Sequence, residues 1–308
     1  MPISRRRQLQ WMALAPVFAP VLKLSARDSA NKLNLKQSAH SISISLADKP
    51  ITTYVFHDDQ VKRPYFKDVF TPGGLRVTRH FPPDPKTEAT DHPTMHPGVW
   101  LAFGRLNGQD YWRNKVVVLH KSVEIHNQNS PETCGFHVTN LYLKEGGSDV
   151  LLYESAHYDF SLSGGKIIWK WNSEIKSASG PILLGHQEEM GLGIRLSNDL
   201  TVKKGPAHLA NSAGGIDEKG TWGKNAEWWA AYRTEQGGGL TGVMLRARSA
   251  PVLPFWGHTR DYGLIVANPT SLPNQKPDVI EIKPGDSLKL QFEIILFDND
   301  KSQLQLIK

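Results

Sequence analysis

The segment TDHPTMHPGVW, from Thr90 to Trp100, holds two histidines four residues apart, with Asp91 before the first. On a helix this spacing would place two imidazoles one turn apart, where both could bind one metal ion. Because proline follows both His92 and His96, an extended or turn conformation is favoured instead. In a straight strand, residues four apart stand about 13 Å from each other, so a shared metal requires the loop to fold back. The alternatives are separate roles in proton transfer and ligand binding, or a turn whose side chains only bond the backbone.

A second segment, GHQEEMGLGIRL at residues 185–196, places two glutamates next to a predicted strand. Alternation puts one apolar set toward the core: Met190, Leu192, Ile194 and Leu196. The opposite face carries Glu189, Gly191, Gly193 and Arg195. Two glycines on one face predict a bare strip of sheet that a flat or ring-shaped ligand could approach, gripped by charges at its ends. The alternative is an ordinary solvent-facing strand, and Glu188 replaces Glu189 on this face if the register shifts by one.

Two further segments supply groups that could bind a ligand. PFWGHTRDYGLIVANP, at residues 254–269, brings four hydrogen-bonding side chains together ahead of an apolar run: His258, Arg260, Asp261 and Tyr262. Side chains at the mouth of a strand are well placed to line a site. TWGKNAEWW contributes Trp222, whose ring could stack on a sugar, although burial in the core is the common alternative for a tryptophan.

The elements that position these residues show a period of two. In SLKLQFEIILF, for example, Leu288, Leu290 and Phe292 alternate with Lys289 and Gln291, as in a strand with one buried face. The other segments of this kind are residues 41–47, 116–126, 136–146, 150–162 and 166–176. Glycine- and proline-rich turns separate them, and only residues 225–235 have the propensity to form a helix. We therefore predict an all-β fold, a large antiparallel β-sandwich formed as a single domain by residues 41–308.

Composition and charge restrict the classes of function. The chain has 308 residues with a net charge of +6, of which four positive charges lie in residues 1–26. The remainder is close to neutral and has no basic face interleaved with aromatic residues, so we predict no nucleic-acid partner. Nucleotide, nicotinamide, zinc-protease and serine-hydrolase motifs are absent, and we predict no cofactor. A single cysteine, Cys134, rules out an internal disulfide.

The amino-terminal residues predict export. Residues 1–26 contain Arg5, Arg6 and Arg7 followed by a short apolar run, as in a twin-arginine signal peptide. The alternatives are an ordinary secretory signal or an uncleaved membrane tether. We expect a periplasmic protein that contacts the membrane only through this segment, with residues 27–40 as a linker. The sequence does not fix the oligomeric state.

Five ordered segments resemble the bacterial family named methane oxygenase PmoA: RPYFKDVFTPGGLRVTRHFPPD, DHPTMHPGVWLAFGRLNGQDYW, GHQEEMGLGIRL, TWGKNAEWW and RDYGLIVANP. The resemblance covers about residues 50–298. It implies an all-β domain from bacteria that degrade complex carbohydrates, without an established reaction, rather than a membrane-bound methane monooxygenase subunit. In that family the first motif usually reads DHPHHRG, so Thr94, Met95 and Pro97 depart from it and put a shared metal site or shared catalysis in doubt. By fold analogy alone, the chain is also similar to the galactose-mutarotase-like supersandwich, in which histidines and a glutamate perform acid/base chemistry on a sugar.

The leading hypothesis is an exported carbohydrate-active protein, an isomerase, lyase or hydrolase. Glu189, or Glu188 after a register shift, would act as general base and His92 or His96 as general acid. The substrate, a carbohydrate or small polar ligand, would be bound by Asp91, Arg195, Trp222, His258, Arg260, Asp261 and Tyr262. One alternative is a non-catalytic carbohydrate-binding domain on the same face. Another is a metal site formed by His92, His96, His258 and a glutamate.

Overall fold

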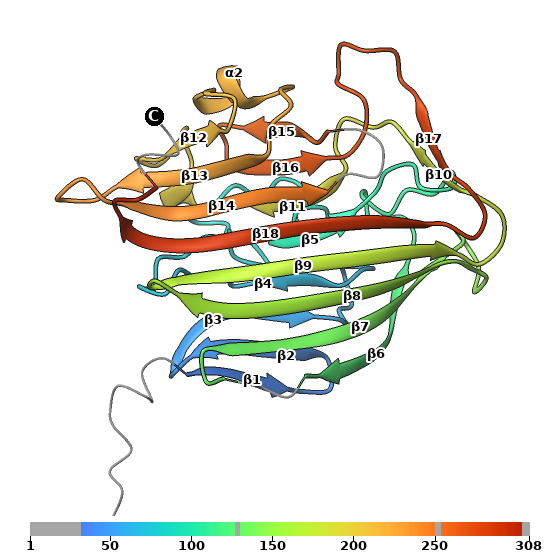
Figure 1. Ribbon diagram of the computed structural model, residues 1–308, viewed down its shortest axis with the longest axis horizontal. Helices are drawn as coiled ribbons and strands as arrows, with labels where there is room; N and C mark the ends of the chain where they lie inside the picture. The colour runs from blue at the N-terminus through green and yellow to red at the C-terminus, as the bar shows by residue number, and fades with distance from the viewer. Residues whose placement is uncertain (1–31, 127–129, 250–253, 304–308) are drawn as a thin grey trace, which may run out of the picture.

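The computed structural model describes residues 32–126, 130–249 and 254–303. The predicted signal peptide, residues 1–26, lies outside these ranges and stays a prediction. Two eight-stranded antiparallel sheets pack face to face and confirm the predicted all-β sandwich. Figure 1 views the molecule down its shortest axis, and the strands of both sheets run across the picture. Among the described residues, no helix is long and apolar enough to span a bilayer.

The first sheet contains the segments that the sequence analysis selected for chemistry. Its spatial order is β1 (Leu33–Gln37), β2 (Ser41–Leu46), β3 (Lys49–Val55), β4 (Tyr65–Lys67), β5 (Val99–Ala102), β11 (Gly191–Arg195), β16 (Leu264–Asn268) and β15 (Trp256–Arg260). Neighbouring strands in this sheet are antiparallel, and β11 lies between β5 and β16. Segments far apart in the sequence therefore meet at the centre of one sheet.

The second sheet covers the inner face of the first. Its order is β12 (His208–Asn211), β13 (Trp228–Thr234), β14 (Leu240–Ser249), β18 (Ser287–Asp300), β9 (Lys166–Ser177), β8 (Val150–Ser163), β7 (Thr133–Leu143) and β6 (Val118–Ile125). Two short strands, β10 (Ile182–Gly185) and β17 (Val279–Ile282), pair with each other at one end of the sandwich (Figure 1). The described helical turns are η1 (Asn198–Leu200) and α2 (Asp217–Thr221).

The structure differs from the sequence analysis in two segments. Part of the predicted linker, residues 33–37, forms β1, because these residues pair with β2 along its whole length. Residues 225–235, the segment with helix propensity, are instead largely strand β13. Trp229 packs in the main core and Trp228 in a smaller cluster, so the segment buries side chains on both faces. Pairing with β12 and β14 on its two edges outweighs the local helix propensity.

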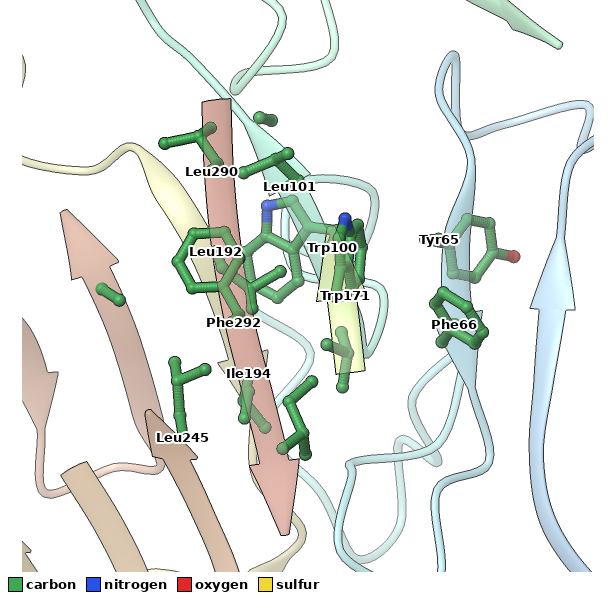
Figure 2. Close-up of a cluster of buried hydrophobic side chains, with 14 of the residues drawn as sticks. Tyr65, Phe66, Trp100, Leu101, Trp171, Leu192, Ile194, Leu245, Leu290 and Phe292 are labelled. Carbon is green, nitrogen blue, oxygen red and sulfur yellow. The ribbon is translucent and has the colours of Figure 1, made fainter. Parts of the chain in front are cut away.

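The core between the sheets follows the predicted alternation. Leu290 and Phe292 from β18 face Leu192 and Ile194 from β11, and all four side chains are buried (Figure 2). Burying one such side chain contributes roughly 1.5–3 kcal/mol, so this core holds β11 firmly in register. The outer face of β11 is thereby fixed as well.

Strand pairing determines which residues share the outer face of the first sheet. Residues directly opposite each other in antiparallel strands point to the same side. Gly193 pairs with Trp100 on one side and Val266 on the other, and Val266 pairs with His258. Arg195 pairs with Leu264, which pairs with Arg260. Two neighbouring rows of the outer face thus bring together Trp100, Gly193, His258, Arg195 and Arg260.

Candidate functional site

The histidine loop folds back on itself. The amide of His96 donates to the carbonyl of His92 at 2.9 Å, and the two ring centroids lie 5.1 Å apart. His92 has a φ of +47°, an uncommon conformation for a residue with a side chain. The guanidinium of Arg63 holds the turn by donating to the carbonyl of Met95 at 2.6 Å. Of the alternatives that the sequence left open, the structure has the folded loop rather than a straight strand.

His96 is buried. Its side chain packs on Trp100, with ring centroids 5.1 Å apart and a small interplanar angle of 21°, and only 1% of the residue is exposed. Burial, followed by the charge of Arg195, lowers the pKa of His96 to about 3, so the imidazole is neutral near pH 7. A buried neutral imidazole is badly placed to protonate a ligand, and the prediction that His96 is a general acid is not supported by this position.

His92 has the opposite environment. Its side chain is 49% exposed, and its Nδ1 lies 3.1 Å from the Asp91 carboxylate. Asp91 in turn pairs with Arg195 at 2.7 Å and with Arg79 at 3.3 Å. Partial burial raises the pKa of Asp91, but the hydrogen bond with His92 and the two guanidiniums outweigh it and leave that pKa below its usual value. An ionised aspartate therefore orients an exposed imidazole.

The predicted bare strip on β11 is wrong. A Cβ atom on Gly193 would lie 2.7 Å from a ring carbon of Trp100, and one on Gly191 would overlap the carbonyl oxygen of Ala267. Gly193 therefore makes room for the indole of Trp100, which covers the strand. No ligand can lie on the glycines while that indole is there. Arg195 is also buried, with 1% of the residue exposed.

Glu188 and Glu189 lie in the bend before β11 rather than in the strand, so the strand begins later than predicted while its register is as predicted. The side-chain amide of Asn268 fixes this bend, because its Nδ2 donates to the backbone carbonyls of Gln187 at 2.8 Å and Glu188 at 2.9 Å. Trp112 Nε1 donates to Glu189 Oε2 at 3.3 Å. The carboxylate of Glu189 is therefore positioned by protein groups.

Glu189 is ionised and partly accessible. His258 Nε2 lies 3.5 Å from Glu189 Oε1, and 23% of the Glu189 side chain is exposed. The adjacent His258 imidazole lowers the pKa of Glu189 to about 2, against the raising effect of burial, and the hydrogen bond from Trp112 adds to this lowering. The carboxylate of Glu189 is therefore ionised and lies beside His258.

His258 links the two glutamates. Its Nδ1 lies 3.4 Å from Glu188 Oε1 while its ring is almost fully buried. Arg260 donates to the same Glu188 oxygen at 2.8 Å and lies 3.4 Å from Glu218. Arg260 is therefore the ion-pair partner of Glu188, which is half exposed. Glu188 thus contacts side chains of β15 rather than the interior of the site.

Several predicted ligand-binding groups are partly occupied by protein contacts. Arg260 lies over the ring of Trp222, with its Cζ 5.3 Å from the ring centroid, so one indole face is covered. Asp261 accepts a hydrogen bond at 2.9 Å from the amide of Glu218, and its own amide donates back to the Glu218 carboxylate at 2.9 Å. These contacts anchor α2 to β15. The ring of Tyr262 packs against the guanidinium of Arg195, with the ring centroid 4.4 Å from Cζ.

The residues that could hold a metal ion differ from the predicted set of His92, His96, His258 and a glutamate. Asp91, His92 and His96 have potential ligand atoms within 4.8 Å of one another, whereas His258 is not part of this group. Arg195 and Arg79 already neutralise Asp91, and a divalent cation there would face two guanidinium charges. The geometry therefore favours an Asp91–His92 pair over a metal centre.

The sequence analysis missed four residues that build the site: Arg79, Trp100, Trp112 and Asn268. Arg79, Trp100 and Trp112 belong to the two longest segments of the family resemblance, and Asn268 to the last one. Membership in those segments was the available signal. Their roles depend on contacts across the sheet, which residue spacing along the chain does not encode.

Comparison with known proteins assigns the family. Residues 41–307 match the family described as a family of unknown function, DUF6807, and the chain belongs to it. This assignment corrects the resemblance to the family named methane oxygenase PmoA, which the match does not support. No curated protein matches the chain.

Solved structures with a similar arrangement have low sequence identity. One is the GH36 α-galactosidase AgaA from Geobacillus stearothermophilus, with 10% identity, a TM-score of 0.43, and coverage of 87% of this chain and 41% of that one. The chain thus spans about two fifths of that protein. Another is a galactose mutarotase related enzyme from Lactobacillus acidophilus, with 11% identity, a TM-score of 0.36, and coverage of 87% of this chain and 98% of that one.

Proposed function

We propose that the protein acts on a carbohydrate by acid/base chemistry at the outer face of the first sheet. Glu189 accepts a proton from the sugar, and His92, oriented by Asp91, donates one. An isomerase, lyase or hydrolase reaction would each use these two steps. Export to the periplasm belongs to the same proposal and is supported by the sequence of residues 1–26.

This proposal rests on the different surroundings of the two candidate glutamates and of the two candidate histidines. Of the two glutamates, Glu189 is held by Trp112 and His258 without an arginine partner in hydrogen-bond distance among the described residues, whereas Glu188 is bound by Arg260. Of the two histidines, His92 is exposed and hydrogen-bonded to a carboxylate, whereas His96 is buried. Glu189 therefore remains as the accessible base and His92 as the oriented imidazole.

The low pKa of Glu189 favours a second candidate, a carbohydrate-binding protein without catalysis. A carboxylate with a pKa of about 2 is a weak base near neutral pH but a good hydrogen-bond acceptor for sugar hydroxyls. For catalysis, substrate binding must weaken the influence of His258 on Glu189 and raise this pKa. The two candidates therefore differ in whether a bound sugar is converted.

The first experiment is a thermal-shift screen of neutral and acidic oligosaccharides, followed by mass spectrometry and NMR of any that bind. With a converted sugar in hand, we expect Glu189→Gln to lower turnover at least about 100-fold while the dissociation constant changes less than about threefold, because glutamine keeps the shape but not the basicity. Glu188→Gln is the matched control and should retain turnover within about tenfold. Saturable binding without any product would support the binding protein, and equal turnover by Glu189→Gln and the wild type would remove Glu189 from catalysis.

A further inference from the structure

A small cationic pocket opens beside the Asp91–His92 pair. It has a volume of about 240 Å³. Its charged and polar lining consists of Arg79, Asp91, Arg195, Asn198, Lys203, Lys204 and Tyr262. Four of these side chains are cationic and one is a carboxylate, so the pocket has a clear excess of positive charge. Asp91, Arg195 and Tyr262 belong both to this pocket and to the candidate site, which makes the two continuous.

The two arginines of the pocket are buried, and Arg195 is the less satisfied of the two. Both Nη atoms of Arg79 donate to backbone carbonyls, those of Ala89 at 2.8 Å, Asp91 at 2.9 Å and His96 at 3.3 Å. Arg195 and Arg79 are 1% and 3% exposed. Among the described residues, Nε and Nη1 of Arg195 and Nε of Arg79 have no hydrogen-bond partner. Buried donors without a partner are costly, and buried charges are normally paired. Asp91 is the carboxylate that these two guanidiniums share, which leaves positive charge uncompensated.

The electrostatics of Arg79 agree with this uncompensated charge. Burial, followed by repulsion from Arg195, lowers the pKa of Arg79 to about 10, and the attraction of Asp91 offsets only part of this effect. A second anion in the pocket would relieve the repulsion between the two guanidiniums. Lys203 and Lys204 stand at the exposed side, where they could meet an incoming anion without being buried first.

We propose that this pocket binds an anionic substituent of the sugar, a carboxylate or a sulfate ester, and that the protein therefore acts on acidic carbohydrates. The guanidinium of Arg195 receives the oxyanion, the charge of Arg79 beside it adds to the attraction, and the two lysines act at longer range. That the ligand is a sugar rests on the proposed function. The presence of an anion site does not depend on it.

The test measures binding by calorimetry at one fixed ionic strength with three oligosaccharides of equal length: a neutral one, a hexuronate and a sulfate ester. The variant is Lys203→Met/Lys204→Met, which leaves the buried arginines intact so that the protein is expected to fold. Lys144→Met/Lys170→Met is the matched control; both lysines are exposed, one directly after β7 and the other in β9. Inorganic sulfate serves as a probe that needs no sugar.

We expect at least one acidic oligosaccharide to bind about tenfold or more tightly than the neutral one, and the comparison of hexuronate with sulfate ester identifies the anion. The Lys203→Met/Lys204→Met variant should lose most of that advantage, while the control keeps it. Equal affinity for neutral and acidic sugars would overturn the inference but leave the proposed function intact. If no sugar binds yet inorganic sulfate binds and the variant weakens it, the anion site stands and the proposed function fails; if sulfate does not bind either, both fail.

Discussion

His92 and His96 lie four residues apart, yet their surroundings decide different roles for them. His96 packs on Trp100 away from solvent, whereas His92 is half exposed and hydrogen-bonded to Asp91. The spacing of the two residues was evident in the sequence, and so was the effect of the prolines. Which imidazole faces solvent depends on Trp100, whose position is set by β5 and the glycine opposite it.

The buried imidazole of His96 makes stability depend on pH. Below about pH 6.5 the unfolded chain binds a proton on this imidazole, whereas folded His96 stays neutral until about pH 3. Protonation therefore favours unfolding, and stability contributed by this group falls as the pH drops from 6.5 toward 3. His96→Phe, which can pack on Trp100 without titrating, should remove about 2 kcal/mol of the stability difference between pH 7 and 4.5.

Urea unfolding at both pH values measures this difference. His57→Phe, at an exposed position, is the control and should leave the pH dependence close to that of the wild type. If His96→Phe has the same pH dependence as the wild type, His96 is not held neutral by burial.

At the scale of the element, β11 shows what an alternating pattern predicts and what it does not. Leu192 and Ile194 face the core as the pattern requires, and the buried set on β18 was predicted in the same way. The two glycines of β11 were also recognised as unusual for a strand. Their partner was misassigned, because the ring that fills the space comes from Trp100, more than 90 residues earlier in the chain.

Gly193→Ala tests whether the indole occupies that space. The added methyl would lie 2.7 Å from a Trp100 ring carbon, so the indole must move, and we expect a loss of about 1–3 kcal/mol in the free energy of unfolding. Gly147→Ala is the control, because its Cβ would have no neighbour closer than 3.9 Å and its backbone is not in the left-handed region. That control should change stability by less than about 0.5 kcal/mol. A Gly193→Ala protein as stable as the wild type would show that the indole does not pack on β11.

At the scale of the whole molecule, the two sheets meet over a core into which a carboxyl group points. Glu154 on β8 is 4% exposed and accepts hydrogen bonds from Asn140 at 2.9 Å and from Ser173 at 2.6 Å. Tyr54 from the first sheet packs nearby against Phe136 of the second, with ring centroids 5.3 Å apart. Burial raises the pKa of Glu154 despite those hydrogen bonds. The all-β sandwich was predictable from strand periodicity, but this buried polar group was not, since its sequence neighbours alternate as in any strand.

Glu154 therefore predicts a pH effect of opposite sign to that of His96. With a raised folded pKa, its contribution is fully present below the unfolded value and is lost as the pH rises through the folded pKa. The melting temperature of Glu154→Gln minus that of the wild type should be at least about 2 °C higher at pH 8 than at pH 4. Scanning calorimetry measures the shift, with exposed Glu281→Gln as the control. The same shift in both variants, or none in Glu154→Gln, would contradict burial of an ionisable carboxyl.

The most direct test of the central claim is the turnover of one acidic oligosaccharide by the wild type, Glu189→Gln, His92→Asn and the double variant. If Glu189 and His92 serve one reaction, each single variant should lose at least about 100-fold, and the double variant should be little worse than the poorer single one, because residues that act as a unit are not additive. His92→Asn with turnover within threefold of the wild type, alongside unchanged binding of the sugar, would contradict the account.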